Sequence, residues 1–302
     1  MAAASRQPSS STWVIIQRNP SSGSGAGRRQ LIVLSKELMR LGYRVRMFRN
    51  RPLMDEWLRD RSSKIAIRCL VAAGGDGTVA DLSNRHPGIP IAILPMGTEN
   101  LLARYLGLRR DGLQLAGVIH QNVVRVLDSA LANGRRFLLM LSSGVDADVV
   151  AALHGKRTGN ISRLNYLIPT VRAFFGSRVR EFEVCSEDQA NRLLGTHVIV
   201  TNIPRYGFQL EFSPDADPSD GLLDVRVCHC KTRWGIVWHA IRLKLGLQIS
   251  ASEFSTFRAA SVRLVATSGG SDRSQCDGDP GPDLPVRVQV ERGTLRLLVP
   301  NK

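Results

Sequence analysis

The chain has 302 residues, a length that suits two domains better than one ordinary core. It is 43% hydrophobic and 22% charged, and it contains no run of 18 apolar residues, which excludes a membrane-spanning helix. Lysine and arginine outnumber the acids 41 to 26, and the net charge of +15 favours polyanionic partners: nucleotides, nucleic acid or an anionic membrane surface.

The cysteines and the first residues indicate the compartment. Five cysteines are scattered without a CxxC pair, which argues against a disulfide framework or a zinc ribbon and favours a reducing environment. Residues 1–12 are small and polar and lack the apolar segment of a secretory signal. We therefore expect a disordered tail over residues 1–12 on a cytoplasmic protein.

The first predicted elements form a cradle for phosphate. A β-branched run at 13–17 predicts a strand, a glycine- and serine-rich loop follows, and leucines at helical spacing from Leu31 to Leu41 predict a helix. Free amides converge at such a helix N-terminus and favour anions. The loop is neither a Walker A sequence nor GxGxxG, since Arg28 stands where the last glycine would be.

Strands and helices then alternate up to about residue 125. Strands are predicted at 45–48, 65–72 and 89–94, and helices at 52–61, after Thr78, at 100–106 and at 113–120. This alternation predicts a doubly wound α/β domain over residues 13–125, with right-handed crossovers.

Two of these strands end in glycine-bearing polar turns. The first turn reads Gly74-Gly75-Asp76-Gly77-Thr78 and the second reads Pro95-Met96-Gly97-Thr98-Glu99-Asn100. Glycine allows a ligand to approach the main chain closely, and the carboxyl ends of parallel strands share one sheet edge. The pattern predicts a ligand crevice at that edge.

The pattern changes in residues 126–302. Short alternating runs separated by turn residues predict an antiparallel β sandwich with helical inserts at 163–175 and 234–247. The predicted strands are 136–141, 179–184, 196–201, 223–228, 261–266, 286–290 and 295–299. The last strands can return towards the first domain.

The second helical insert has an apolar stripe beside basic residues. The stripe contains Trp234, Val237, Trp238, Ile241 and Leu245. Two tryptophans beside cations suit a membrane interface. We nevertheless expect the stripe to pack on the helix's own sheet, with the membrane interface as the alternative.

Five motifs in this order resemble the diacylglycerol kinase catalytic-domain family, whose relatives include sphingosine and ceramide kinases. They are Asn19-Pro20-Ser21-Ser22-Gly23, the two turns above, Asp220-Gly221-Leu222-Leu223-Asp224 and Asp277-Gly278-Asp279. The resemblance runs from about residue 13 to 300. It implies an ATP-dependent lipid kinase that binds its nucleotide in the crevice between an α/β domain resembling that of NAD kinases and phosphofructokinases and a β-sandwich domain.

The resemblance also assigns residues to the nucleotide. By motif, the residues that line the nucleotide would be Asn19, Pro20, Ser21, Ser22, Gly23, Gly74, Gly75, Asp76, Gly77, Thr78, Asp81, Gly97, Thr98 and Asn100. Asp76 would bind Mg²⁺, directly or through water, or accept a hydrogen bond from a hydroxyl. The alternative is an aspartate that only shapes the turn. Arg28, Arg29, Arg104, Arg109 and Arg110 flank the glycine loops and either steer ATP or are solvated.

A carboxylate near the lipid hydroxyl would take its proton. The family usually places a glutamate third in Asp-Gly-Glu, and this chain has Asp279 there, with a stem one methylene shorter. We expect Asp279 to be the proton acceptor and to lie close to Asp76. Asp277 would be either a partner of Asp76 or a turn residue.

In bacterial relatives a loop matching 213–221 holds a structural Mg²⁺. By position, Asp220 would supply its side chain, and Asp217 and Leu222 their carbonyl oxygens. The alternative is a solvated acidic loop.

Several functions stay open at this stage. The leading one is phosphorylation of a lipid hydroxyl at a membrane surface, with diacylglycerol as the first acceptor, sphingoid bases as the next, and peripheral membrane contact. The others are a soluble-substrate kinase such as NAD kinase, and a catalytically weak lipid or nucleotide sensor. We expect no nucleic-acid partner, since no basic stripe is interleaved with aromatics. A homodimer is compatible with the sequence.

Overall fold

The chain folds into two compact units. The structure, a computed structural model, describes residues 12–19, 25–154, 172, 174–187, 192–206, 210–247, 250, 252–267 and 272–301. The first unit takes residues 1–127 and 294–302, and the second takes residues 128–293. Two strands, β5 (Val124–Ala132) and β18 (Val286–Leu298), contain residues of both units.

The first unit is built on a parallel sheet in the order β2-β1-β3-β4. Its strands are β1 (Thr12–Arg18), β2 (Arg44–Phe48), β3 (Ala66–Gly74) and β4 (Ile91–Pro95). In β18, Leu297 pairs with Ile91 of β4 in the same parallel sense. The central strands are runs of buried apolar residues, as expected for a sheet covered on both faces.

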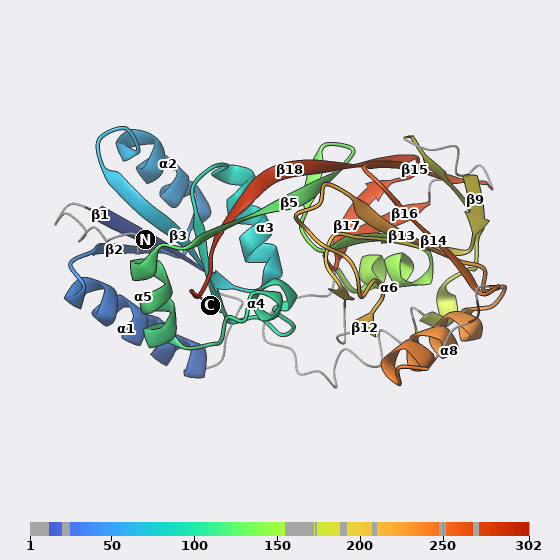
Figure 1. Cartoon of the computed structure of the whole chain (residues 1–302), viewed down its shortest axis with the longest axis horizontal. Coiled ribbons are helices and arrows are strands. Elements are labelled where there is room, and N and C mark those ends of the chain that lie inside the picture. The colour runs from blue at the N-terminus through green and yellow to red at the C-terminus, as the bar shows by residue number, and fades with distance from the viewer. Residues whose placement is uncertain are drawn as a thin grey trace. The chain divides into compact units, whose positions relative to one another are not determined.

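Helices cover both faces of this sheet. They are α1 (Gly25–Arg40), α2 (Arg51–Arg61), α3 (Asp76–Arg85), α4 (Leu101–Tyr105) and α5 (Gly112–Gln121). Figure 1 shows α1 and α5 together on one face and α2 on the other. Local signals set their starts: Asn50 accepts from the Leu53 amide at α2, and Asp111 accepts from the Leu113 amide at α5.

The second unit is a sandwich of antiparallel sheets. One sheet has the order β14-β13-β10-β7-β16-β17, and the facing strands are β18, β15, β8 and β9, with β5 and β6 beside β18. Alternate residues of both sheets meet in one core, which includes Val198, Val225, Leu264 and Val286.

The remaining bounds of this unit follow. The strands are β6 (Arg135–Phe137), β7 (Met140–Ser143), β8 (Phe182–Ser186), β9 (Arg192–Gly195), β10 (His197–Thr201), β11 (Arg205–Tyr206), β12 (Leu210–Glu211), β13 (Leu223–Cys228), β14 (Phe254–Ala259), β15 (Ser261–Ala266), β16 (Arg273–Cys276) and β17 (Asp279–Asp283). The helices are α6 (Val145–His154) and α8 (Arg233–Lys244).

The predicted fold class is confirmed, and three details were wrong. The strand predicted at 136–141 is interrupted, because the amides of Leu138, Leu139 and Met140 bond to the carboxylate of Asp277. The strands predicted at 286–290 and 295–299 are one strand, β18. Residues 1–11 of the predicted tail and most of the helix predicted at 163–175 lie outside the described residues.

The third error concerns the apolar stripe of α8, which does not pack on the sheet. Trp234, Trp238 and Leu245 are 59%, 57% and 65% exposed. Of the helix's twelve residues, all of them described, only His239 is buried. Among the described residues, none of the helices is both long enough and apolar enough to cross a membrane.

Asp277 should be a main determinant of stability in the second unit. Its oxygens lie 2.8, 2.9 and 3.0 Å from the three amide nitrogens, and its own φ of 53° makes the turn that brings them together. We expect Asp277→Ala to lower the free energy of unfolding by about 2–3 kcal/mol, because it leaves the amides of three buried residues without an acceptor. Urea unfolding measures this, with the exposed Asp283→Ala as control. Equal losses in the two variants would contradict the assignment.

Candidate active site

The two predicted glycine turns meet in the first unit. The Met96 amide donates to the Gly74 carbonyl at 2.8 Å. A Cβ added at Gly97 would lie 2.7 Å from the Gly75 Cα, and one added at Gly74 would lie 2.1 Å from the Thr78 hydroxyl. Glycine is therefore required at Gly97 because the two turns approach closely, and at Gly74 because the Thr78 hydroxyl occupies the space of a Cβ; the sequence had predicted the glycines for the approach of a ligand.

The carboxylate of Asp76 joins the first turn to the helix after the second. Its Oδ2 accepts from the Leu101 amide at 2.9 Å and its Oδ1 from the Leu102 amide at 3.1 Å. Burial raises the pKa of Asp76, and the two amide bonds act in the opposite direction. Each oxygen keeps a further lone pair, so the structure gives Asp76 an architectural role and leaves the predicted Mg²⁺ or hydroxyl contact as a prediction.

Asn100 and Arg110 hold the second turn. Asn100 has a left-handed backbone, with φ of 50°, and its side chain bonds both to the amide and to the carbonyl of Gly97, at 2.9 and 2.8 Å. Arg110 donates to the Pro95 carbonyl at 2.8 Å and to the Gly97 carbonyl at 3.4 Å. Thr98 is exposed at the tip. Arg110 thus fixes the turn with its guanidinium.

The end of β1 reaches the same edge. The Asn19 amide donates to the Ala73 carbonyl at 3.1 Å. In the first turn of α1, a Cβ on Gly27 would lie 2.7 Å from the Met96 methyl, so this helix end packs on the second turn. Pro20, Ser21, Ser22 and Gly23, predicted to line the nucleotide, lie outside the described residues.

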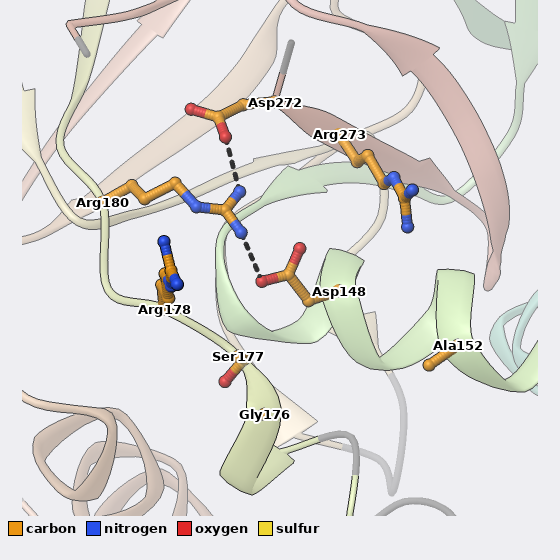
Figure 2. A pocket seen from close by; sticks show the side chains of 8 residues that line it. All are labelled: Asp148, Ala152, Gly176, Ser177, Arg178, Arg180, Asp272 and Arg273. Atoms are coloured by element: carbon orange, nitrogen blue, oxygen red, sulfur yellow. Dashed lines mark hydrogen bonds and ion pairs between the residues drawn. The ribbon is translucent and has the colours of Figure 1, made fainter. Parts of the chain in front are cut away.

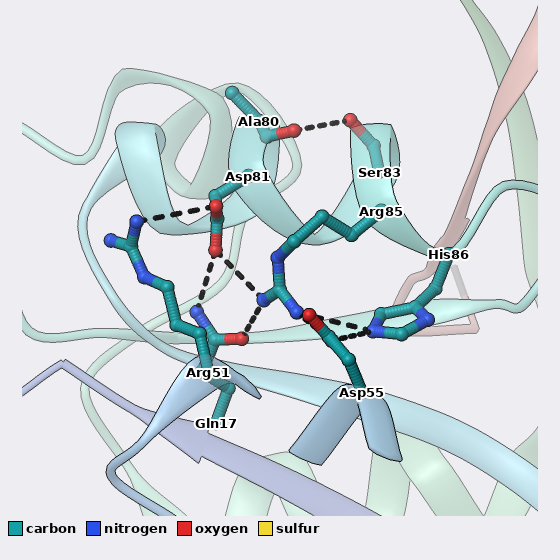
Figure 3. Close-up of polar contacts among 8 residues, drawn as sticks. All are labelled: Gln17, Arg51, Asp55, Ala80, Asp81, Ser83, Arg85 and His86. Carbon is teal, nitrogen blue, oxygen red and sulfur yellow. Dashed lines mark hydrogen bonds and ion pairs between the residues drawn. The ribbon is translucent and has the colours of Figure 1, made fainter. Parts of the chain in front are cut away.

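Asp81 belongs to a charged cluster that the sequence did not reveal (Figure 3). Its Oδ2 accepts from Gln17 at 2.9 Å and from Arg85 at 2.8 Å, and its Oδ1 lies 3.3 Å from Arg51. Burial acts to raise the pKa of Asp81, but the bonds from Arg85 and Gln17 outweigh it and lower that pKa. The only signal was a polar Gln17-Arg18 pair at the end of an apolar strand.

The predicted proton acceptor lies in the second unit. Asp279 is half-buried and begins β17, where it pairs with Cys276. Asp277 is a turn residue bonded to the three amides described above. Asp76 belongs to the first unit, and its proximity to Asp279 stays a prediction.

In the second unit, the acidic loop predicted to hold Mg²⁺ is paired with an arginine side chain. Asp217 accepts from the Ser219 amide at 3.0 Å, and Asp220 Oδ1 accepts from the Leu222 amide at 2.9 Å. Leu222 is half-buried. Asp220 Oδ2 forms an ion pair with Arg258, which also lies 3.7 Å from Asp224. In the described part of the chain, no three His, Cys, Asp or Glu side chains are placed to hold a metal. A cation at Asp220 would compete with Arg258.

A second polar network on the outer face of the six-stranded sheet was also missed. Asp146 accepts from Ser142, whose hydroxyl accepts from Gln275 at 2.6 Å, and His197 lies 3.6 Å from Asp146. Gly144, with φ of 136°, makes room for His197, whose Nδ1 would lie 2.3 Å from an added Cβ. The sequence signal was a glycine and an aspartate directly after a strand.

Two family models match almost the whole chain. Residues 12–132 match the diacylglycerol kinase catalytic domain, and residues 140–299 match the YegS C-terminal NAD kinase beta sandwich-like domain. The chain belongs to the diacylglycerol kinase catalytic-domain family. This confirms the resemblance drawn from the five motifs, and the family is one of phosphotransferases.

Relatives named as diacylglycerol kinases are distant in sequence. The chain is 26% identical to one from Mycobacterium tuberculosis over 247 residues, 76% of each protein. It is 26% identical to one from Bacillus subtilis over 166 residues, which are 52% of this chain and 54% of that protein. The chain thus spans about half the length of the latter relative. A crystal structure of a diacylglycerol kinase from Bacillus anthracis superposes with a TM-score of 0.69 at 19% identity, covering 96% and 97% of the two chains, which shows the shared fold.

If a divalent cation binds this family member at Asp220, Arg258→Gln should bind it better. Removing the guanidinium frees the carboxylate, so we expect Mg²⁺ to raise the Tm of the variant by about 2–4 °C more than that of the wild type. Thermal unfolding with Mg²⁺ and with EDTA measures the difference, and the exposed Arg263→Gln is the control. Identical Mg²⁺ responses in all three proteins would show that Arg258 does not compete with a cation.

The Asp81 cluster predicts a pH-dependent stability. Because the folded-state pKa of Asp81 is below its unfolded value of about 4, its contribution is present above that pH and is lost as the pH falls below it. We expect Asp81→Asn to cost about 1–3 kcal/mol at neutral pH and much less at pH about 3. Urea titrations at both pH values test this. A pH-independent difference between variant and wild type would refute it.

Proposed function

We propose that the chain transfers the γ-phosphate of ATP to a lipid hydroxyl, with diacylglycerol as the first acceptor and phosphatidic acid as its product. The observation that carries the proposal is the convergence of three strand ends in the first unit, with the backbones of Gly75 and Gly97 in contact. Family membership supplies the class of reaction.

The glycine turns offer the chemistry that phosphate needs. Helix α3 begins at Asp76 with a glycine, Gly75, at its N-cap position, so no N-cap side chain covers its first turn, and Gly77 is exposed there. Free amides and the positive end of the helix dipole favour an anion. We therefore assign the phosphates of ATP to this edge, with Mg²⁺ neutralising their charge as in other phosphoryl transfers.

The second requirement is removal of the acceptor's proton. In the proposed step, the lipid hydroxyl gives its proton to the Asp279 carboxylate, its oxygen bonds to the γ-phosphorus, and the bond to the ADP oxygen breaks. Support comes from the position of Asp279 in the Asp-Gly-Asp motif and from its half-buried place at the start of β17.

An acceptor screen tests the activity. The full chain is incubated with labelled ATP and Mg²⁺ and with dispersed diacylglycerol, sphingosine or NAD. We expect label in diacylglycerol. Label only in sphingosine would assign a sphingoid-base kinase. Label only in NAD would overturn the lipid proposal, and ATP binding with no transfer would favour a sensor.

The proton acceptor is tested separately. We expect Asp279→Asn to lower kcat by about 10²–10⁴-fold while leaving the Tm and ATP binding unchanged, because only the base is removed. Asp279→Glu should retain activity, since it restores the family's usual residue. The exposed Asp283→Asn is the matched control on the same strand. Unchanged turnover in Asp279→Asn would remove Asp279 from the mechanism.

A further inference from the structure

Helix α8 has its apolar side chains on the outside. Trp234, Trp238, Ile241 and Leu245 recur at helical spacing, and they are 59%, 57%, 41% and 65% exposed. For a helix of a water-soluble protein, this stripe would normally face the core. The inversion needs an apolar partner outside the molecule.

The inner side of α8 explains why the stripe does not turn inward. Its buried residue, His239, stacks edge-on against Phe254, and the guanidinium of Arg226 lies 4.4 Å from the centre of the same ring. Burial lowers the pKa of His239 to about 4, with Arg226 acting in the same direction. In the described part of the chain, neither ring nitrogen of His239 has a hydrogen-bond partner. The inward side of the helix is thus its histidine, packed on Phe254 beside the Arg226 guanidinium, and the apolar stripe stays outside.

A neighbouring turn extends the apolar surface. Phe175 is 55% exposed, and its ring centre lies 5.8 Å from that of Trp234. Arg233, in the first turn of α8, donates to the Phe174 and Phe175 carbonyls and ties this turn to the helix. We call this surface the aromatic face: Phe175, Trp234, Trp238, Ile241, Leu245 and Leu247.

Cations surround the aromatic face. Residues 231–247 include Lys231, Arg233, Arg242 and Lys244 and contain no aspartate or glutamate. Arg242 is paired with Glu253 at 2.7 Å. In an isologous contact between two copies, this basic rim would meet itself and repel. Charge complementarity therefore favours an anionic surface over a second copy.

Directly after Phe175 the chain lines an arginine-rich cavity of about 560 Å³ (Figure 2). Arg180 is paired with Asp148 at 2.7 Å and with Asp272 at 2.5 Å. Arg178 and Arg273 line the same cavity, and among the described residues neither has a carboxylate within ion-pair distance. Three arginines against two aspartates leave a positive excess beside the aromatic face, which suits a phosphate group.

We propose that the aromatic face and the Arg178–Arg273 cavity together dock the protein on a bilayer that contains anionic phospholipid. The tryptophans enter the headgroup region with the apolar stripe, and the two arginines take up headgroup phosphate. The inference rests on the proposed function in that a lipid kinase must reach an acceptor held in a bilayer. The inference adds which surface of the protein binds the bilayer and which lipid charge that surface recognises.

Flotation with vesicles, in the absence of ATP, tests the docking. Vesicles are phosphatidylcholine alone or phosphatidylcholine with added phosphatidylglycerol. We expect the wild type to float with the anionic vesicles, and the bound fraction to fall about tenfold or more in Trp234→Glu/Trp238→Glu. The control, Met39→Glu/Leu113→Glu, replaces residues of the first unit that are 55% and 59% exposed and should float like the wild type. Unchanged Tm values confirm that all variants are folded.

Charge and fluorescence give independent readouts. Arg178→Gln/Arg273→Gln should weaken binding to anionic vesicles by about fivefold per arginine and leave the weak binding to neutral vesicles unchanged.

Vesicles should shift the tryptophan emission of the wild type to the blue, and the Trp234→Phe/Trp238→Phe protein should lose this shift. The remaining tryptophans, Trp13 and Trp57, contact each other in the first unit and serve as internal reference.

The outcomes separate this inference from the proposed function. The docking proposal is overturned if the wild-type protein does not bind anionic vesicles. It is also overturned if the Trp234→Glu/Trp238→Glu protein floats like the wild type. A wild-type dimer that the same double substitution converts to a monomer overturns it as well, because a second copy would then cover the face. Turnover is measured on a water-soluble short-chain diacylglycerol. Normal turnover with lost flotation in the double variant supports the surface, whereas flotation without transfer to any acceptor would overturn only the kinase proposal.

Discussion

The contact between the Asp76 carboxylate and the Leu101 and Leu102 amides is the constraint on which the first unit's site depends. It fixes the start of α4 relative to the glycine turn, and Asn100 and Arg110 then hold the second turn from its other sides. The first amides of a helix have no main-chain carbonyl to bind within the helix, and the carboxylate satisfies two of them at the start of α4.

The second unit repeats this device with Asp277, whose carboxylate binds three successive amides and separates β6 from β7. In each unit, the carboxylate of one motif aspartate, Asp76 or Asp277, accepts hydrogen bonds from main-chain amides. Asp279, two residues after Asp277, is thus placed by an anchored turn.

The sequence predicted the elements where local pattern and burial agree. Strands β13 and β15 have the predicted bounds, and the two glycine turns lie at strand ends, because buried parallel strands must end in polar turns. The sequence prediction failed where a residue far away in the chain determines the structure. The break before Met140 depends on Asp277, and the Asp81 cluster depends on Gln17 and Arg51. The prediction that the apolar stripe of α8 packs on the sheet was wrong, because periodicity identifies an apolar face but not what that face contacts.

The shared strand β18 has a consequence for biosynthesis. Residues 294–298 belong to the first unit, and Leu297 pairs with Ile91 of β4, although some two hundred residues separate them. While the second unit is being made, β4 lacks this neighbour and presents an unpaired sheet edge. Leu297 must therefore leave the ribosome before this sheet edge is paired, so β4 is open to edge-to-edge aggregation while the second unit is made.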